Sequence, residues 1–370
     1  MPISRRLLAV AGVPVAVAIF VVIAAPYIIA PPRIEGAKDV LHRAKPIPVP
    51  GEGPESLDWD PQGEGPYVGV ADGRILKWRG EVLGWSEFAV TSPNRENCSK
   101  HVPELEHICG RPLGVHFEKK SGDLYICDCY FGVMKVGPGG GLAEKVVDEA
   151  AGRKVTFTNH MDIDEEEDAI YFTDSSDKYQ IRTVFNAFMS GEKTGRVIRY
   201  DKKTKEAKVI MENLHFPNGL ALSKDGSFVV VCEPPSLLVH RYWLKGPKAG
   251  SRDVFAKLPG YSDNIRRTAD GDFWVAIHSK KGVFPQFALI HPWIGKFLMK
   301  TMKMELMVYL FEGGKPHAVA VKLSEKGEIM EILEDSQGKT MTFVSEVQER
   351  DGKLWFGSVF MPFVWVYDLN

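Results

Sequence analysis

Five polar residues occupy equivalent positions in a repeated pattern, although they lie far apart in the sequence. Each comes at the start of the first strand expected in its unit: Glu55, Asn159, Asn218, Asp263 and Asn264. Carboxylates and amide carbonyls are hard oxygen donors, and two acids with three asparagines match the ligands that calcium prefers. Zinc or copper would instead favour histidine and cysteine. The set predicts a calcium (Ca2+) site, provided that the fold brings equivalent positions together.

A structural interpretation competes with the metal site. Polar groups confined in a channel need hydrogen-bond partners, and asparagine also supports turns. For an isolated pair such as Asn218-Gly219 the turn is the better interpretation. For five donors at one repeat position we favour metal binding.

The elements that would position these residues form six similar units. Each unit has a short alternating strand, a turn rich in Asp and Gly, and an apolar strand; such self-similarity at about 40 to 50 residues indicates a propeller or solenoid. Further alternating segments, such as 73–78 and 195–200, supply outer strands, giving four strands per unit. We therefore predict an all-β, six-bladed β-propeller over residues 51–370, with a seven-bladed or irregular propeller as the alternative. The units begin at Glu55, Pro112, Asn159, Asn218, Asp263 and Ser345.

The N-terminus carries a membrane-directing signal. Arg5 and Arg6 precede an uncharged apolar stretch from Leu7 to Ala30, which at about 1.5 Å per helical residue is long enough to cross a hydrocarbon core of roughly 30 Å. This length favours a retained signal anchor over residues 1–30, followed by a linker at 31–50, with the propeller in the lumen of the endoplasmic reticulum or vacuole or outside the plasma membrane. Cleavage of the segment would instead give a secreted protein.

Cysteine usage agrees with this secretory compartment. Cys98 and Cys109 bracket a short polar loop of the kind that a disulfide fixes in an oxidising lumen. The remaining cysteines, Cys127, Cys129 and Cys232, lie on apolar strands and are expected to be buried thiols. Asn97 begins an Asn-Cys-Ser glycosylation sequon, which would share the loop with the disulfide.

An insertion at residues 283–304 combines aromatic and apolar residues with lysines. We expect an amphipathic helix or lid, which either caps one face of the propeller or touches the bilayer near the anchor. The chain has a net charge of −2 and no basic cluster, so nucleic acid is an unexpected partner. A small molecule is the expected ligand, and the oligomeric state is not readable from the sequence.

Several motifs resemble a known superfamily. Gly53-Pro54-Glu55, Phe216-Pro217-Asn218-Gly219-Leu220 and Ser262-Asp263-Asn264 are similar to motifs of the calcium-dependent six-bladed hydrolases, which include gluconolactonase, paraoxonase and diisopropylfluorophosphatase. Within that superfamily, residues 97–112, 126–130, 193–196 and 262–266 resemble strictosidine synthase and its plant relatives. The anchored layout also resembles adipocyte plasma membrane-associated protein, an animal relative of the same group.

The resemblance implies roles for individual residues. It assigns the five polar residues to calcium, with Asp263 doubling as base or nucleophile and His160 accepting or shuttling a proton. In the alternative interpretation, strand alternation turns His160 away from the channel; several superfamily members have Asp at this position.

The glutamate of strictosidine synthase is replaced here by Ser345, which cannot deprotonate an amine, and Glu346 faces the opposite side of the strand. We expect a calcium-dependent hydrolase of a small ester, lactone or phosphoester. The alternatives are a non-catalytic propeller that binds a metabolite or partner and, less favoured, a Pictet-Spengler enzyme.

Overall fold

The computed structural model describes residues 30–98 and 102–369, which fold mainly into β-strands. Six sheets of four or five strands and one two-stranded sheet make up the fold. Most neighbouring strands within a sheet follow one another in the chain and pair antiparallel through short turns. The strands in the middle of the sheets are apolar throughout: all six residues of β19 (Phe228–Glu233) are buried, as expected for a strand covered by sheets on both faces.

The six large sheets succeed one another along the chain. Sheets one to three contain β3 (Leu57–Asp58), β4 (Tyr67–Gly69), β5 (Arg74–Trp78) and β6 (Trp85–Val90), with β10 (Gly141–Leu142) added to the edge; β7 (Pro112–Phe117), β8 (Leu124–Asp128), β9 (Gly132–Val136) and β11 (Glu144–Val147); and β14 (Thr158–Asp164), β15 (Ala169–Asp174), β16 (Gly195–Asp201) and β17 (Ala207–Leu214).

Sheets four to six complete the set, and a small hairpin stands apart from them. They contain β18 (Leu220–Leu222), β19, β20 (Leu238–Trp243) and β21 (Arg252–Lys257); β22 (Gly260–Arg267), β23 (Phe273–Lys280), β24 (Ala318–Leu323) and β25 (Ile329–Asp335), with β1 (Lys38–Asp39) at the edge; and β26 (Val344–Arg350), β27 (Lys353–Ser358), β28 (Phe363–Asp368) and β2 (Lys45–Pro48). The hairpin pairs β12 (Glu149–Ala150) with β13 (Arg153–Lys154).

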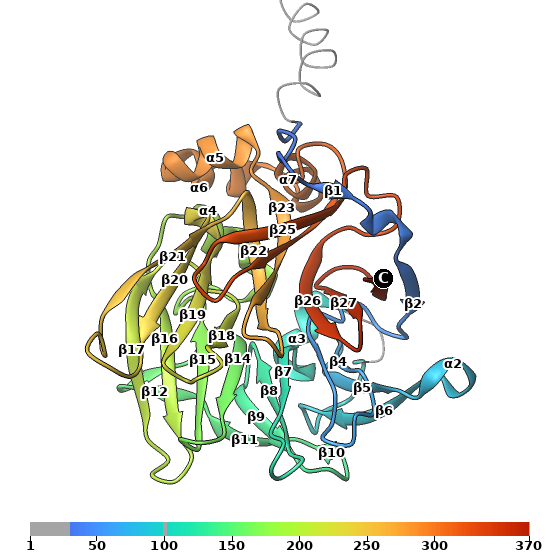
Figure 1. Ribbon diagram of the computed structural model, residues 1–370, viewed down its shortest axis with the longest axis vertical. Coiled ribbons are helices and arrows are strands. Elements are labelled where there is room, and N and C mark those ends of the chain that lie inside the picture. The colour runs from blue at the N-terminus through green and yellow to red at the C-terminus, as the bar shows by residue number, and fades with distance from the viewer. Residues whose placement is uncertain (1–29, 99–101, 370) are drawn as a thin grey trace, which may run out of the picture.

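The first strands of the six sheets lie next to one another in a circuit, and five of them, β7, β14, β18, β22 and β26, are labelled in Figure 1. Contacts join β3 to β7, β7 to β14, β14 to β18, β18 to β22, and β22 to β26. The circuit closes where the backbone N–H of Leu57, on β3, donates to Oε1 of Glu346, on β26, at 3.1 Å. Residues at the start of each first strand are thereby brought to one place, as the repeat pattern predicts.

The segment expected to be a linker, residues 31–50, instead contributes strands to two sheets. β1 pairs in parallel with β25, and β2 pairs antiparallel with β28. Pro46 and Pro48 lie on β2, which is an edge strand, where the missing N–H of proline is tolerated. The structure differs from the expected linker over residues 38–48, because this segment offers free backbone groups to two open sheet edges.

Helices gather at one end of the molecule (Figure 1). The expected insertion at 283–304 forms α5 (Val283–Ile290), α6 (Pro292–Thr301) and the start of α7 (Met304–Phe311), which pack near α4 (Val184–Met189). Short helices elsewhere are α2 (Gly80–Leu83), α3 (Glu106–Cys109), η1 (Leu41–Arg43), η2 (Pro103–Leu105), η3 (Ile181–Thr183) and η4 (Pro234–Ser236).

Within the described part of the chain, no helix has the length and apolarity needed to span a membrane. The predicted anchor, residues 1–30, lies outside the described residues except for Ala30.

The predicted disulfide between Cys98 and Cys109 is present. Cys127, Cys129 and Cys232 are free and buried, as expected from their apolar strands. Asn97 is exposed beside the disulfide. Its glycosylation stays a prediction.

Candidate functional site

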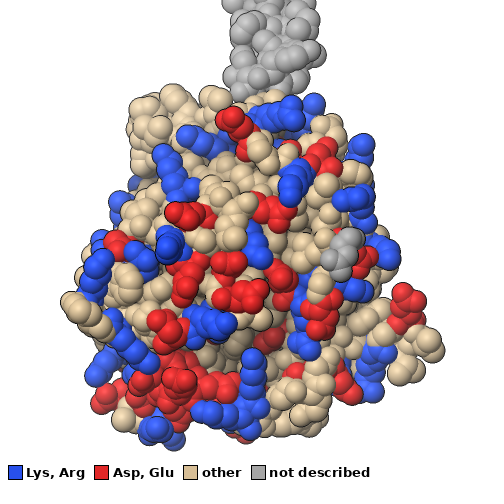
Figure 2. All heavy atoms as spheres, viewed as in Figure 1, with Lys and Arg blue, Asp and Glu red and all other residues tan. Residues whose placement is uncertain are grey.

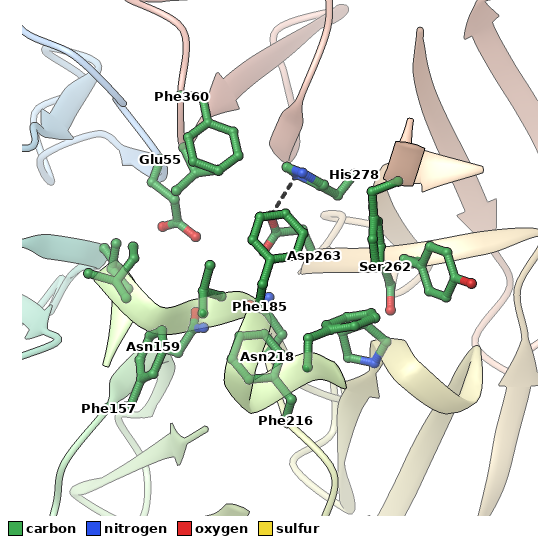
Figure 3. A pocket seen from close by; sticks show the side chains of 18 residues that line it. Glu55, Phe157, Asn159, Phe185, Phe216, Asn218, Ser262, Asp263, His278 and Phe360 are labelled. Atoms are coloured by element: carbon green, nitrogen blue, oxygen red, sulfur yellow. Dashed lines mark ion pairs between the residues drawn. The ribbon is translucent and has the colours of Figure 1, made fainter. Parts of the chain in front are cut away.

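Four of the five predicted ligands line a single cavity of about 100 Å³. Glu55 precedes β3, Asn159 lies in β14, Asn218 precedes β18, and Asp263 lies in β22. Their polar groups point toward a shared space, with phenylalanine rings around it (Figure 3). Four sheets thus each supply one oxygen-bearing side chain to the same site.

The fifth predicted ligand, Asn264, does not line the cavity. Its side chain is fully buried, and its Nδ2 donates to Oε1 of Glu55 at 3.0 Å. Asn264 therefore orients the Glu55 carboxylate. The register of β22 is irregular between Ser262 and Ile265. The side chains of Asp263 and Asn264 therefore do not follow the strict alternation of a regular strand.

The cavity end of this cluster contains acceptor atoms that lack donors. Oε2 of Glu55 and the Oδ1 atoms of Asn159, Asn218 and Asn264 are buried without a hydrogen-bond partner. The amide of Asn159 is oriented by its Nδ2, which donates to Oγ of Ser175 at 3.2 Å. Because buried polar atoms almost always have partners, several orphaned oxygens in one place fit a bound cation that prefers oxygen ligands.

The two carboxylates of the site repel each other in a dry environment. Burial, together with the negative charges of Asp263 and Glu346, raises the pKa of Glu55 well above its usual value. Burial also raises the pKa of Asp263 to about 8. A positive charge between the two groups would relieve this cost. Among the described residues no cluster of three or more His, Cys, Asp or Glu side chains is placed to hold a metal, so the asparagine carbonyls are essential to the proposed ligand set.

His278 is a site residue that the sequence reasoning missed. It lines the cavity, and its Nδ1 lies 3.7 Å from Oδ2 of Asp263 (Figure 3). The rings of Phe343 and Phe360 pack on it, with centroids 5.7 and 5.8 Å away. Burial lowers its pKa to about 4, so the imidazole is neutral at neutral pH. One signal was available: His278 is the only histidine in the apolar strand β23, which pairs with β22.

His160 lies outside the cavity, despite being next to Asn159. It is fully buried, its Nε2 lies 3.3 Å from Oε2 of Glu346, and its Nδ1 accepts a hydrogen bond from the Leu220 N–H at 3.3 Å. Strand alternation turns His160 away from the cavity that Asn159 lines, as the alternative interpretation of this residue predicts. Among the histidines of the described chain, His278 lies beside Asp263 and His160 does not.

Ser345 and Glu346 are also outside the cavity. Oγ of Ser345 donates to the backbone carbonyl of Glu55 at 2.5 Å. Glu346 binds Arg266, with Nε to Oε1 at 2.9 Å. Neither residue is among those that line the cavity.

The walls of the cavity are apolar. Helix α4 supplies Phe185 and Phe188, α7 supplies Phe311, and no lysine or arginine is among the lining residues. Phe188 and Phe311 pack edge to face with centroids 5.1 Å apart. The other apolar lining residues are Leu113, Phe157, Ile181, Val184, Phe216, Pro234, Tyr261, Val359 and Phe360.

Two family profiles match the sequence. Strictosidine synthase matches residues 159–247, and the N-terminal region of strictosidine synthase-like proteins matches residues 39–78. The protein STRICTOSIDINE SYNTHASE-LIKE 1 of Arabidopsis thaliana is 73% identical over 324 residues, covering 86% of this chain and 82% of its own. STRICTOSIDINE SYNTHASE-LIKE 8 of the same plant is 63% identical, covering 100% of this chain and 99% of its own.

Solved structures of distant sequence share the fold. A gluconolactonase of Xanthomonas campestris superposes with a TM-score of 0.60 at 15% identity, covering 92% of this chain and 97% of its own. A putative gluconolactonase gives a TM-score of 0.57 at 16% identity, covering 87% of this chain and 91% of its own. At these identities the likeness shows a propeller fold and leaves the activity open.

Proposed function

Since the chain belongs to the strictosidine synthase-like family, we propose that it is a six-bladed β-propeller that hydrolyses a small ester, lactone or phosphoester with the help of calcium. The six large sheets and the circuit of contacts between their first strands support six blades. We also propose that residues 1–30 anchor it in a membrane of the secretory pathway, with the propeller in the lumen, where the Cys98–Cys109 disulfide would be stable.

One observation carries the hydrolase proposal: the orphaned oxygens of Glu55, Asn159 and Asn218 face the cavity in which Asp263 and His278 lie. Glu55, Asn159, Asn218 and Asp263 would hold the calcium ion, and Asn264 would fix Glu55. Calcium, when bound, supplies a Lewis acid that polarises a carbonyl or phosphoryl oxygen.

The chain's own groups supply the remaining functions. The Asp263 carboxylate lies where it can accept a proton from attacking water or act as the nucleophile, and His278, 3.7 Å away, can receive or return that proton. The phenylalanine walls exclude bulk water and contact the apolar part of the substrate. Because no lysine or arginine lines the cavity, we infer that the substrate is uncharged: a neutral ester, a lactone or a phosphotriester.

Strictosidine synthesis is not proposed for this chain. The amine-activating glutamate is replaced by Ser345, whose hydroxyl is engaged with the Glu55 carbonyl, and Glu346 is bound to Arg266.

The test measures calcium binding and hydrolysis on the same preparations of the full-length chain in detergent. Isothermal titration with calcium and turnover of phenyl acetate and a panel of lactones are compared for wild type, Asn218→Ala and Asp263→Ala. We expect each substitution to weaken calcium binding at least about tenfold, which corresponds to about 1.4 kcal/mol, and to abolish turnover. Asn186→Ala is the matched control, because Asn186 lies on α4 and is not among the lining residues.

Two results would contradict the proposal in different ways. Wild type that binds no calcium would overturn the metal site. Wild type that binds calcium but turns over no ester, lactone or phosphotriester would support the alternative, a propeller in which the ion is structural and the cavity binds a metabolite.

A further inference from the structure

The helical end of the molecule exposes a concentrated apolar face. Seven of the fifteen large apolar side chains exposed in the described residues lie on α5, α6 and α7: Val283, Phe287, Ile290, Trp293, Phe297, Leu306 and Tyr309. Trp293 is 71% exposed and Ile290 69%. This face, here called the apolar helix face, forms largely uncharged surface over α5 and α6 in Figure 2. Soluble monomers rarely leave such a contiguous patch without a partner.

The opposite sides of the same helices are firmly packed. Ala288 of α5 and Met307 and Phe311 of α7 are buried in the aromatic cluster above the cavity. Gly295 of α6 lies so close to α4 that an added Cβ would stand 2.5 Å from the carbonyl oxygen of Met189. The exposed side chains are thus held outward by helices that are fixed to the body.

The composition of this face suits a lipid surface. Lys296, Lys300 and Lys303 are exposed on or directly after α6, beside Trp293 and Phe297. Spacings of four residues place Trp293 with Phe297 and Lys296 with Lys300 as neighbouring stripes on one helix. Aromatic side chains next to lysines are typical of helices that lie in the interface between headgroups and acyl chains, where the lysines meet anionic headgroups.

The position of Ala30 points to the occupant. The described chain starts at Ala30, at the end of the molecule that carries α5, α6 and α7 (Figure 1). The sequence up to and including Ala30 has 24 uncharged residues from Leu7, enough to cross a bilayer. A membrane entered by this segment would lie against the same end of the molecule. We propose that the apolar helix face of α5, α6 and α7 docks on the surface of the lipid bilayer.

This docking would place the cavity close to the membrane. Phe311, at the end of α7, is buried in the cluster beneath the helices and also lines the cavity. One helical layer therefore forms both the docking surface and part of the cavity wall. The docking proposal does not depend on the hydrolase proposal, since lipid contact and turnover are measured separately.

The experiment places a reporter on the helix face of the full-length chain in vesicles. Phe297→Cys carries an environment-sensitive nitrobenzoxadiazole dye, and the matched control is Val82→Cys on α2, which is 96% exposed and lies away from the helical end. The native free cysteines are buried and should not react. Vesicles contain phosphatidylcholine with or without phosphatidylserine, and nitroxide-labelled lipids act as quenchers.

We expect the dye at position 297 to shift to the blue and to be quenched at least about twofold more strongly than the dye at position 82, because an interfacial helix buries its apolar side chains below the headgroups. Phosphatidylserine should increase this quenching, and K296E/K300E/K303E should remove the increase. Ile290→Cys repeats the measurement on α5.

Equal quenching at positions 297 and 82 would overturn the proposal. A blue shift at 297 without lipid quenching, accompanied by disulfide crosslinking of unlabelled Phe297→Cys chains under oxidising conditions, would also overturn it and would show that a second copy covers the face.

Discussion

Two neighbouring layers along the central axis differ in how their buried polar and charged groups are paired. In the cavity layer, Oε2 of Glu55 and the Oδ1 atoms of Asn159 and Asn218 have no donor from the protein. In the layer next to it, the guanidinium of Arg266 donates to Glu346 Oε1 at 2.9 Å, to Ser56 Oγ at 3.0 Å and to the Val115 carbonyl at 2.9 Å. One layer has its cation built into the chain, and the other has acceptors that lack one.

The carboxylates of the two layers respond accordingly. Burial raises the pKa of Asp263 to about 8. Burial would also raise that of Glu346, but the charge of Arg266 and a hydrogen bond with His160 outweigh it and lower the pKa of Glu346 to about 2. Adjacent residues in the chain serve different layers, as with Glu55 and Ser56, or Asn159 and His160. A shift of one residue therefore separates a candidate ligand from a structural ion pair.

The largest expected effect comes from removing the built-in cation. Arg266→Met leaves Glu346 buried without its ion-pair partner, which should reduce the free energy of unfolding by about 3–5 kcal/mol. Urea denaturation of the full-length chain measures the loss. Adding Glu346→Leu to this variant should restore much of it, and a loss below about 1 kcal/mol in the single variant would show that this layer does not depend on the pair.

The pH dependence of Glu346 gives the next effect. Its pKa falls from 4.5 to about 2 on folding, so its contribution to stability is fully present above pH 4.5 and is lost as the pH falls through about 2. The shift corresponds to about 3 kcal/mol. The difference in unfolding free energy between wild type and Glu346→Gln should therefore shrink from pH 6 toward pH 2. A difference independent of pH would contradict the assigned ion pair.

Asp263 should show the opposite sign when calcium is removed by a chelator. Because folding raises the pKa of Asp263, the contribution of this group to stability is present below pH 3.8 and is lost as the pH rises through about 8. Asp263→Asn should thus stabilise the calcium-free chain at pH 8 by at least about 1 kcal/mol, and less at pH 5. Thermal unfolding at both pH values measures this. Added calcium should stabilise wild type more than the variant; an identical response would exclude Asp263 as a ligand.

The smallest effect is expected at the partly exposed rim of the charged layer. His116 lies 3.4 Å from both Asp58 and Asp162, and its side chain is 22% exposed. Solvent screens such contacts, so His116→Asn should cost about 1 kcal/mol or less in denaturant unfolding. His116 Nδ1 also accepts a hydrogen bond from Arg266 at 2.9 Å, and a loss as large as that of Arg266→Met would show that the buried network depends on this contact.

The repeat pattern predicted the strand positions that meet at the axis, because every unit places its first strand there. Four of five predicted ligands consequently line one cavity. Asn264 does not line the cavity, but its Oδ1 is buried without a hydrogen-bond partner next to Glu55, so its role as a ligand stays a prediction.

Other site features depend on contacts that a repeat does not encode. His278 comes from the second strand of its sheet, outside the repeat position used to find ligands. The aromatic walls combine α4 and α7, which are far apart in the sequence and meet only through tertiary packing. The sequence allowed two roles for the insertion, capping the propeller or touching the bilayer, because only the folded chain shows which of its side chains are exposed.

The pairing of β2 with β28 determines when the last sheet can be completed. β2 lies more than 300 residues before β28, so β2 has no partner until β28 has left the ribosome. At about 5–20 residues per second, the early strand waits for many seconds. Folding chaperones would thus meet a chain in which β2 still exposes its backbone groups, and a stop codon upstream of β28 would leave β2 permanently unpaired.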